Sequence, residues 1–450
     1  MIIKNSIFRQ GASHIKKNLV CQDCAATAVI DDDTVILALS DGHGSERYFR
    51  SGDGSRIAVG VAVDAAKEFL SRFNPDVMLS ADDSASYIRA GVPYDALPDG
   101  PGQLPSPEMA RLFGHFARAI ILRWHRAIMS HWNDNPVDFG KLSPAIKNYF
   151  IEGGQLNESK IPKAYGCTLM LAVRAAGFWF AIHIGDGKII AFRADGTAWE
   201  PVPWDKACFT TTTTSLCELD EKRTRLAYGT DMDDVAALFL GSDGMDDSFP
   251  DIAGLESTYG INFLRRMAVS GLDLNENSYL ERLLDYISHN FSGDDMSVAY
   301  WVDSESLSGM IPGILKAEVG RLVRMIADCD TRIERIHRDI LRNDESLERI
   351  EKDFAKHKEG GSLFEDIIAN IRLLSDFGIS NDKLKTACKE TAPSIQGMEN
   401  DLIREKTRLE VMAGVLRKNL AAVEAERTSH ETSLSKFKAL LDETQCYIPQ

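Results

Sequence analysis

The stretch that decides the fold is Ser40-Asp41-Gly42-His43-Gly44, which directly follows the apolar run TVILAL at residues 34–39. The run is strand-length and rich in Val, Ile and Leu, and it therefore predicts a buried β-strand. The aspartate stands where this strand ends, and the glycines beside it leave room for a close approach. A carboxylate that projects from a rigid sheet into an open loop is well placed to bind a cation.

Three further clusters repeat this pattern next to other strand-like runs. They are Gly185-Asp186-Gly187, Gly241-Ser242-Asp243-Gly244-Met245-Asp246-Asp247, and Gly293-Asp294-Asp295-Met296-Ser297. A single Asp-Gly pair is usually an ordinary turn, but four such clusters in one domain indicate a shared site. Converging carboxylates form an oxygen-rich site for Mg²⁺ or Mn²⁺. Two such ions can activate water for in-line displacement at phosphorus.

Length and charge narrow the class of protein. At 450 residues, with 44% hydrophobic and 26% charged residues, the chain is typical of a globular protein of two or three domains. Residues 311–450 contain 23 Lys and Arg against 25 Asp and Glu, so most of the net charge of −16 falls on the first part. Such an acidic domain is unsuited to nucleic acid. No signal sequence or membrane span is evident, and we expect a cytoplasmic protein without a membrane partner.

The eight cysteines are scattered, which argues against a disulfide scaffold. Cys21 and Cys24 form a lone CxxC pair, with no second pair of Cys or His residues to complete a zinc site. Because a strand-like run follows this pair, we interpret the two residues as ordinary buried thiols.

Up to about residue 302, strand-like runs alternate with helical patterns, which indicates an α+β layered domain. The runs lie at residues 34–40, 168–173, 178–184, 188–192, 235–240 and 297–302, and the helical patterns at 55–72, 107–131 and 275–290. Residues 75–107 are dense in Pro, Gly, Asp and Ser and predict a long loop or an insertion.

After Gly313 the pattern changes to that of a coiled coil. Residues recur at spacings of three and four through Val319, Leu322, Ile326, Cys329, Ile333, Ile336, Ile340, Asn343, Leu347, Ile350 and Phe354. We expect Gly360-Gly361 and Ala392-Pro393-Ser394 to break the helices, with a heptad-like segment again at 409–441. These helices could fold back as an antiparallel hairpin, pair between chains, or pack as a bundle on the first domain.

Taken together and in their order, the motifs of residues 7–303 resemble the metal-dependent protein phosphatases of the 2C type, the PPM family. Gln22-Asp23 matches the opening acidic pair of that family, and Asp41-Gly42-His43-Gly44 matches its signature. Gly166-Cys167-Thr168, Gly185-Asp186, the segment from Asp243 to Asp247, and the segment from Asp294 to Ser297 match later motifs. The resemblance implies an α-β-β-α sandwich of two antiparallel sheets at residues 1–305, with an insertion at about 73–160. An α-helical coiled-coil domain would follow at 312–446.

The resemblance also implies a role for each matching residue. Two core ions, Mn²⁺ or Mg²⁺, would be bridged by Asp41, and the carbonyl of Gly42 would ligate one of them. Asp243 and Asp294 would complete the second ion's protein ligands, and Asp186 and Asp247 would form a third, weaker position that shares Asp243. Asp23 would hold metal-bound waters, and a metal-bound water or hydroxide would be the nucleophile. His43 would be the general acid that protonates the departing serine or threonine oxygen.

Several departures from the family bear on substrate choice. Gln22 replaces a glutamate, and Asn18 stands where the family has its phosphate-binding arginine. His14, Lys16 and Lys17 are the nearby cationic candidates for phosphate binding. The stretch from residue 44 to 166 is longer than is usual in the family. The stretch from 186 to 243 is shorter, so we expect the flap that shapes substrate access to be reduced. These changes are typical of the divergent bacterial-type branch.

Two functions remain open at this point. The first is hydrolysis of phosphoserine or phosphothreonine on a protein, with the coiled coil used for dimerisation or for a partner such as a cognate serine/threonine kinase. The second is a catalytically weak adaptor that binds a phosphoprotein or a kinase. The set of Asp41, Asp186, Asp243, Asp294 and His43 favours the enzyme.

Overall fold

The computed structural model describes residues 2–74, 78–79, 84–88, 106–203, 208, 213–220, 223–230, 235–249, 259–270, 277–376 and 382–446. The chain divides into two compact units, Met1–Leu315 and Lys316–Gln450, which are described here one at a time. None of the described helices is long and apolar enough to cross a membrane.

The described residues of the first unit form two large antiparallel sheets and one two-stranded sheet. One large sheet has the strand order β1 (Ile2–Arg9), β13 (Met296–Asp303), β12 (Ala237–Gly241), β9 (Lys188–Phe192) and β10 (Ala198–Trp199). The other has the order β2 (Cys24–Val29), β3 (Val35–Ser40), β7 (Leu169–Ala175), β8 (Phe178–Ile184), β11 (Arg225–Gly229) and β4 (Ser84–Ile88). Because Ile2 pairs with Asp303, the first and last strands of the unit lie side by side.

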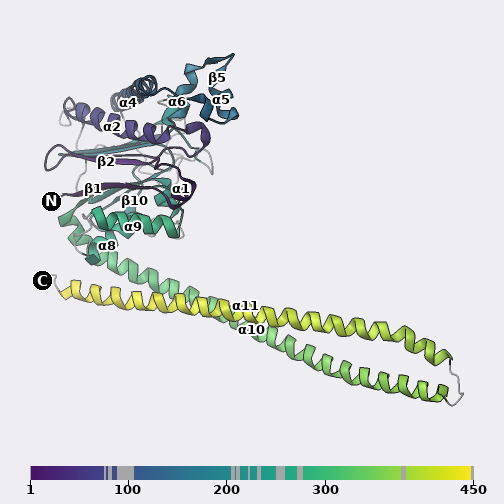
Figure 1. Cartoon of the computed structure of the whole chain (residues 1–450). Coiled ribbons are helices and arrows are strands. Elements are labelled where there is room, and N and C mark those ends of the chain that lie inside the picture. The colour runs from purple at the N-terminus through teal and green to yellow at the C-terminus, as the bar shows by residue number, and fades with distance from the viewer. Residues whose placement is uncertain are drawn as a thin grey trace. The chain divides into compact units, whose positions relative to one another are not determined.

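Three buried clusters hold these layers together. Between the two sheets lie Leu37 and Leu39 of β3, Leu238 of β12 and Trp301 of β13, all fully buried. A second cluster joins the outer face of the β3 sheet to α2 (Ser51–Leu70) and α4 (Pro107–Asp134). The third joins the β13 sheet to α8 (Tyr259–Ser270), α9 (Asn277–Asn290) and the first residues of α10. The layers therefore follow the order α-β-β-α (Figure 1), which confirms the predicted sandwich.

The described part of the expected insertion is mostly helical. After α4 come η3 (Phe139–Lys141), α5 (Pro144–Phe150), the short strands β5 (Ile151–Glu152) and β6 (Gln155–Leu156), η4 (Glu158–Lys160) and α6 (Ile161–Ala164). The Ser106 hydroxyl accepts a hydrogen bond from the Met109 amide at 3.3 Å, and Pro107 occupies the first turn of α4. This is a strong start signal for a helix. Most of the Pro/Gly-rich segment at 75–105 lies outside the described residues.

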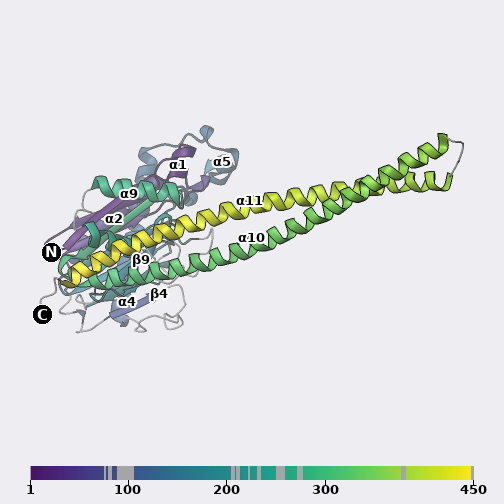
Figure 2. The ribbon, with the colours of Figure 1, turned by 90° about the horizontal axis from the view of Figure 1, so that it is seen from below.

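The second unit is a helical hairpin formed by α10 (Ser304–Asp376) from residue 316 onward and α11 (Asp382–Cys446) (Figures 1 and 2). Asp330 pairs with Arg427, and Glu351 pairs with Lys406. The buried Asn343 amide donates to the Leu409 carbonyl at 3.1 Å. These partners follow opposite orders along the two helices, so the helices are antiparallel. Of the three arrangements left open by the sequence, the structure has the hairpin.

Both helix breaks expected in this region are wrong. Gly360 and Gly361 lie inside α10, and Pro393 lies inside α11. A glycine costs a helix about 1 kcal/mol and an interior proline about 3 kcal/mol. Residues with partly buried side chains continue past the glycines, at Phe364 and Ile368 for example. Packing of one helix against the other can offset these local costs.

Candidate metal centre and active site

The four aspartate clusters occupy loops that connect the strands of the sandwich. Asp41 follows β3, Asp186 follows β8, Asp243 opens α7 (Asp243–Asp247) after β12, and Asp294 precedes β13. The turn before Asp186 depends on Gly185, whose φ is +127°. A Cβ atom at Gly185 would also lie 2.5 Å from the Thr168 Cβ atom, so only glycine fits there.

Three of these aspartates converge on one point. Carboxylate oxygens of Asp41, Asp186 and Asp243 all lie within 4.8 Å of one another. Burial and then the charge of Asp243 raise the pKa of Asp41 well above its usual value. Burial and then the charge of Asp186 raise the pKa of Asp243 to about 7. Carboxylates held this closely repel one another until a cation or a proton neutralises them.

Asp23 belongs to the same group. It is 4% exposed, and the Ser297 hydroxyl donates a hydrogen bond to its Oδ2 atom at 2.6 Å. Burial and the charge of Asp295 raise the pKa of Asp23 to about 7, and Asp41 is a further neighbour. The structure therefore places Asp23 beside Asp41, as the resemblance implies for a residue at the edge of the core site.

Asp294 lies outside the close group and has an imidazole neighbour of its own. Its Oδ1 atom is 3.4 Å from the His14 Nε2 atom, and Asp295 Oδ1 is 3.0 Å from the His14 Nδ1 atom. Contact with these carboxylates, Asp295 first, raises the pKa of His14 against the opposing effect of burial. His14, one of the expected phosphate-binding residues, thus has both ring nitrogens facing carboxylates.

The other expected phosphate-binding residues lie on the surface. Lys16 and Lys17 are exposed in the last turn of α1 (Ala12–Lys17). Asn18, at the position of the family's arginine, ends this helix with a left-handed φ of 56° and ψ of 37°. Asparagine adopts this conformation more readily than most residues, so the helix end accounts for the change.

His43 lies beside Tyr48 of η1 (Glu46–Tyr48), with their ring centroids 4.7 Å apart. Its amide donates to the Gly166 carbonyl at 3.1 Å. The Lys163 ammonium group lies over the Tyr48 ring, 5.0 Å from its centroid. Burial and then the charge of Lys163 lower the pKa of His43 to about 4. At neutral pH the imidazole is therefore uncharged.

The structure also identifies supporting residues that the sequence reasoning missed. The guanidinium group of the fully buried Arg225 donates to the Gly185 carbonyl at 2.8 Å, and the Thr214 hydroxyl accepts from the Gly185 amide at 2.8 Å. Together they fix the turn that carries Asp186. Asp247, which the resemblance assigns to a third metal position, lies at the surface, and partial removal of its carboxyl group from water, followed by the charge of Asp294, raises its pKa. No motif marks Arg225 or Lys163, because neither lies in a patterned stretch.

Gln22, which replaces the family's glutamate, acts here as a hydrogen-bond donor. Its side-chain amide donates to the Ser51 hydroxyl at 2.7 Å and to the His43 carbonyl at 3.4 Å. Its backbone amide donates to Asp295 at 2.6 Å. An ionised glutamate could not donate to a carbonyl group, so the change suits this environment.

Cys21 and Cys24 of the CxxC pair are both free thiols. Burial raises the pKa of each thiol. Both residues are only half-buried, however, so the prediction that they are buried is wrong.

The donor set of this centre consists of carboxylate oxygens that repel one another, which fits hard divalent cations such as Mg²⁺ and Mn²⁺ rather than soft metals. Asp41, Asp186 and Asp243 are the residues that the structure brings together for this purpose. Asp23 and Asp294 lie close enough to this group to interact electrostatically with its carboxylates.

Comparison with known proteins gives one match to a family model. The model described as "Protein phosphatase 2C" matches residues 10–284, which is more than half of the chain. A search of curated proteins finds no match.

Among solved structures, the chain is similar to serine/threonine phosphatase Stp1 from Staphylococcus aureus, with 12% identity over 67% of this chain and 95% of that one, and a TM-score of 0.38. It is also similar to the catalytic domain of the phosphatase PstP in complex with two manganese ions, with 15% identity, coverages of 67% and 97%, and a TM-score of 0.35. It is similar as well to RsbX in complex with magnesium, with 11% identity over 67% of this chain and 99% of that one, and a TM-score of 0.33.

Proposed function

The chain belongs to the protein phosphatase 2C family, and from this premise we propose that it hydrolyses phosphoserine and phosphothreonine on proteins with the help of bound Mn²⁺ or Mg²⁺. The observation that carries the proposal is the convergence of Asp41, Asp186 and Asp243 within 4.8 Å. When bound, such ions act as Lewis acids that offset the charge of a transferring phosphoryl group and make water a better nucleophile.

In this proposal, Asp41, Asp243 and Asp186 hold the metal ions, with Asp294, Asp247 and the Gly42 carbonyl as further ligands. Asp23, with Ser297 as its hydrogen-bond donor, orients water at the edge of the centre. A buried carboxylate with a pKa near 7 can also accept a proton at physiological pH.

His43 remains the proposed proton donor to the departing serine or threonine oxygen. Its lowered pKa leaves the imidazole uncharged, and therefore a poor acid, in the substrate-free state at pH 7. A phosphate monoester dianion beside the ring would favour the protonated form and raise the pKa. We therefore propose that substrate binding itself charges His43.

Lys163 is our proposed replacement for the missing phosphate-binding arginine. It is the cation that most affects His43, and its ammonium group stands over Tyr48, the aromatic neighbour of His43. His14 faces Asp294 and Asp295 instead, which leaves Lys163 better placed to meet a substrate phosphate.

The proposed function is tested by phosphate release from a phosphothreonine peptide with saturating Mn²⁺. We expect Asp243→Asn to abolish release, because it removes one of three converging carboxylates, while circular dichroism remains unchanged. The matched control is Asp64→Asn on the exposed surface of α2, which should keep full activity. Activity that survives EDTA or Asp243→Asn would contradict the metal-dependent function, and peptide binding without phosphate release would favour the adaptor.

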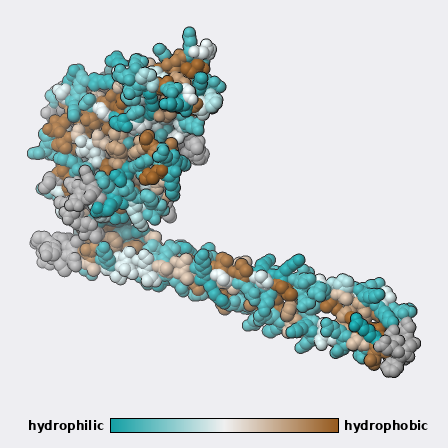
Figure 3. Space-filling view, in the orientation of Figure 1, coloured by the Kyte–Doolittle hydropathy of each residue, from teal (hydrophilic) through white to brown (hydrophobic). Residues whose placement is uncertain are grey.

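We also propose that the hairpin serves self-association or partner binding, including a cognate kinase. Its surface carries apolar residues between polar ones (Figure 3), and Leu341, Leu363, Met398 and Val411 are each at least 60% exposed. Contiguous exposed apolar patches mark protein contacts, and we propose that these side chains contribute to one.

A further inference from the structure

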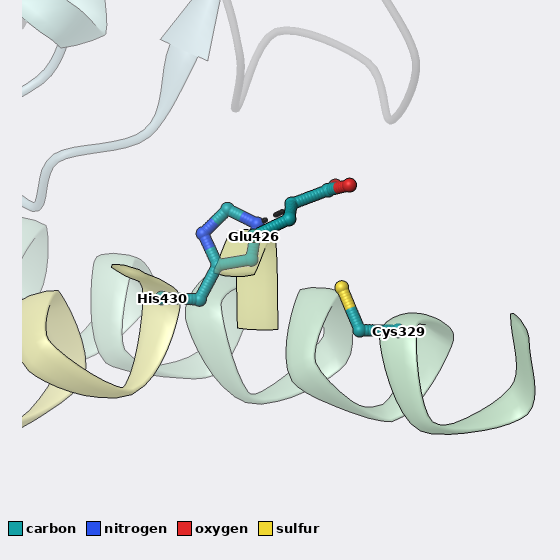
Figure 4. A group of neighbouring side chains, drawn as sticks. All are labelled: Cys329, Glu426 and His430. Atoms are coloured by element: carbon teal, nitrogen blue, oxygen red, sulfur yellow. Dashed lines mark ion pairs between the residues drawn. The ribbon is translucent and has the colours of Figure 1, made fainter. Parts of the chain in front are cut away.

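One cluster of metal-binding side chains lies far from the aspartates in the sequence and belongs to the hairpin alone. Cys329 comes from α10, and Glu426 and His430 come from α11. One ligand atom of each residue lies within 4.8 Å of the others. Figure 4 shows the three side chains gathered between the two helices, with a dashed line from His430 to Glu426.

The environments of Cys329 and His430 differ from that of an ordinary surface ion pair. Cys329 is 1% exposed, and it occupies a heptad position of the α10 seam. The His430 Nε2 atom is buried and has no hydrogen-bond partner among the described residues. Its nearest carboxylate oxygen, Glu426 Oε1, is 3.7 Å away, which is too long for a hydrogen bond. An unpaired buried imidazole nitrogen is costly, and a metal ion would satisfy it.

The sequence of α11 places His430 in the seam and Glu426 at its exposed edge. The apolar heptad positions of α11 run through Leu416, Leu420 and Val423 and resume at Leu434. His430 falls in the gap between them, and Glu426, one helical turn before it, brings its carboxylate toward His430 and Cys329 of the facing helix. This interruption of an apolar seam has a chemical explanation if the three residues share a ligand.

We propose that Cys329, Glu426 and His430 form a site for a borderline transition-metal ion, with Zn²⁺ as the best fit, that clamps α10 to α11. A thiolate, an imidazole and a carboxylate are the ligand types that Zn²⁺ accepts, and water would complete a four-coordinate shell. Binding forms an S–Zn bond, and the thiol proton leaves to solvent.

The neighbouring charges are compatible with this site. Arg332 Nη1 lies 3.2 Å from Glu426 Oε1 and 3.1 Å from Oε2. A carboxylate can accept several contacts, so Oε1 can bind metal while Oε2 keeps the guanidinium group as an outer partner. Tetrahedral ligands at about 2.0–2.3 Å from Zn²⁺ lie roughly 3.3–3.8 Å apart, so closure needs inward movement of about 1 Å from the side chains. The Glu426 side chain is 42% exposed and is free on its solvent side to make that movement.

The test uses the full-length protein titrated with Co²⁺, a spectroscopic probe for Zn²⁺ sites. A thiolate ligand gives a charge-transfer absorption in the near ultraviolet, whereas the carboxylate-only catalytic centre cannot. We expect the band in the wild type, its bleaching by one equivalent of Zn²⁺, and its loss in Cys329→Ser. The matched control is Cys388→Ser, which changes a partly buried cysteine on α11 and should keep the band.

A second variant and a second measurement cover the risk that Cys329→Ser disturbs the hairpin. His430→Gln keeps the thiol and should weaken Zn²⁺ binding by more than the roughly 10- to 100-fold cost of changing an outer-shell residue. In the wild type, Zn²⁺ should slow hydrogen exchange of the amides around Cys329 and His430. A wild-type titration without the thiolate band would overturn the site. So would a band that persists in Cys329→Ser, or Zn²⁺ affinity unchanged in His430→Gln.

Discussion

A buried carboxyl group lies beside the centre around Asp41. Asp295 is 3% exposed. It accepts hydrogen bonds from the Gly11 and Gln22 amides, each at 2.6 Å, and lies 3.0 Å from the His14 imidazole. A buried carboxyl group requires such hydrogen-bond partners. His14, Asp295 and the backbone of Gln22 are therefore best understood together, as one hydrogen-bond network.

At the same scale, the role of His43 can be separated from metal binding. A serine alkoxide is a poor leaving group that needs a proton, whereas p-nitrophenolate does not. General acid catalysis contributes about 10²- to 10⁴-fold. We expect His43→Gln to slow hydrolysis of a phosphothreonine peptide by that order and to leave p-nitrophenyl phosphate hydrolysis nearly unchanged, as measured by kcat at saturating Mn²⁺. Equal losses on both substrates would instead assign His43 a positioning role.

Lys163 should affect both substrate binding and the titration of His43. A hydrogen bond to a charged group contributes about 1.5–3 kcal/mol, so Lys163→Gln should raise KM for a phosphopeptide by about tenfold or more. It should also raise the pKa of His43, because the Lys163 charge lowers it. Steady-state kinetics and NMR titration of the imidazole measure the two effects. Lys160→Gln, on a lysine that stacks over Tyr149 at 4.8 Å, is the control and should change neither.

At the scale of elements, the two helix-breaking sequences of the hairpin face each other. Gly361 of α10 and Ala392, next to Pro393 of α11, both line a cavity of about 560 Å³ between the helices. Neither a glycine, which has no side chain to fill the space, nor a proline, which lacks an N–H group, strengthens the pairing there. The sequence predicts that these residues break the helices, and neither helix ends there.

The exposed face of the hairpin gives an element-scale prediction. If Leu341 and Val411, 62% and 63% exposed, contribute to a protein contact, then Leu341→Glu with Val411→Glu should lower the assembly size seen by light scattering. Both residues lie outside the buried seam, so helicity should remain unchanged. Leu322→Glu, a change at a position that is 2% exposed, should reduce helicity instead. A full-length protein that is monomeric and captures no kinase would leave the hairpin without the proposed role.

At the scale of the whole molecule, sequence patterns located strands β2, β3, β7, β8, β9, β12 and β13 and all four aspartate loops. Residues 178–184 are apolar except for His183, because β8 is buried on both faces. Among the strands that were missed, β1 mixes polar and apolar residues, β11 contains the buried Arg225, and β4 lies in the segment predicted as a loop or an insertion. Arg225 and Lys163 reach the site through tertiary folding, and a linear motif cannot reveal such partners.

The stability of the whole first unit should depend on pH through its crowded carboxylates. The pKa of Asp23 and that of Asp243 are raised from 3.8 to about 7, and that of Asp41 is raised as well. Below about pH 4 these groups are protonated in both the folded and the unfolded state. Between pH 4 and 7 the folded state retains protons that the unfolded state has released, so its stability falls as pH rises. Metal-free protein should therefore unfold at a lower temperature at pH 8 than at pH 5.

Bound Mn²⁺ should reverse this trend, because it binds the deprotonated carboxylates of the folded state and stabilises that state by mass action. Calorimetry with EDTA and with Mn²⁺ at both pH values measures the difference, which should be largest at pH 8. Asp243→Asn removes one repelling charge, so it should flatten the metal-free pH dependence and reduce the stabilisation by Mn²⁺. The control Asp64→Asn should keep both the metal-free pH dependence of stability and the stabilisation by Mn²⁺. Two results would contradict this account: equal stability of the metal-free protein at pH 5 and pH 8, or stabilisation of Asp243→Asn by Mn²⁺ as strong as that of the wild type. Either result would mean that the carboxylates do not form the charged centre from which we inferred the phosphatase function.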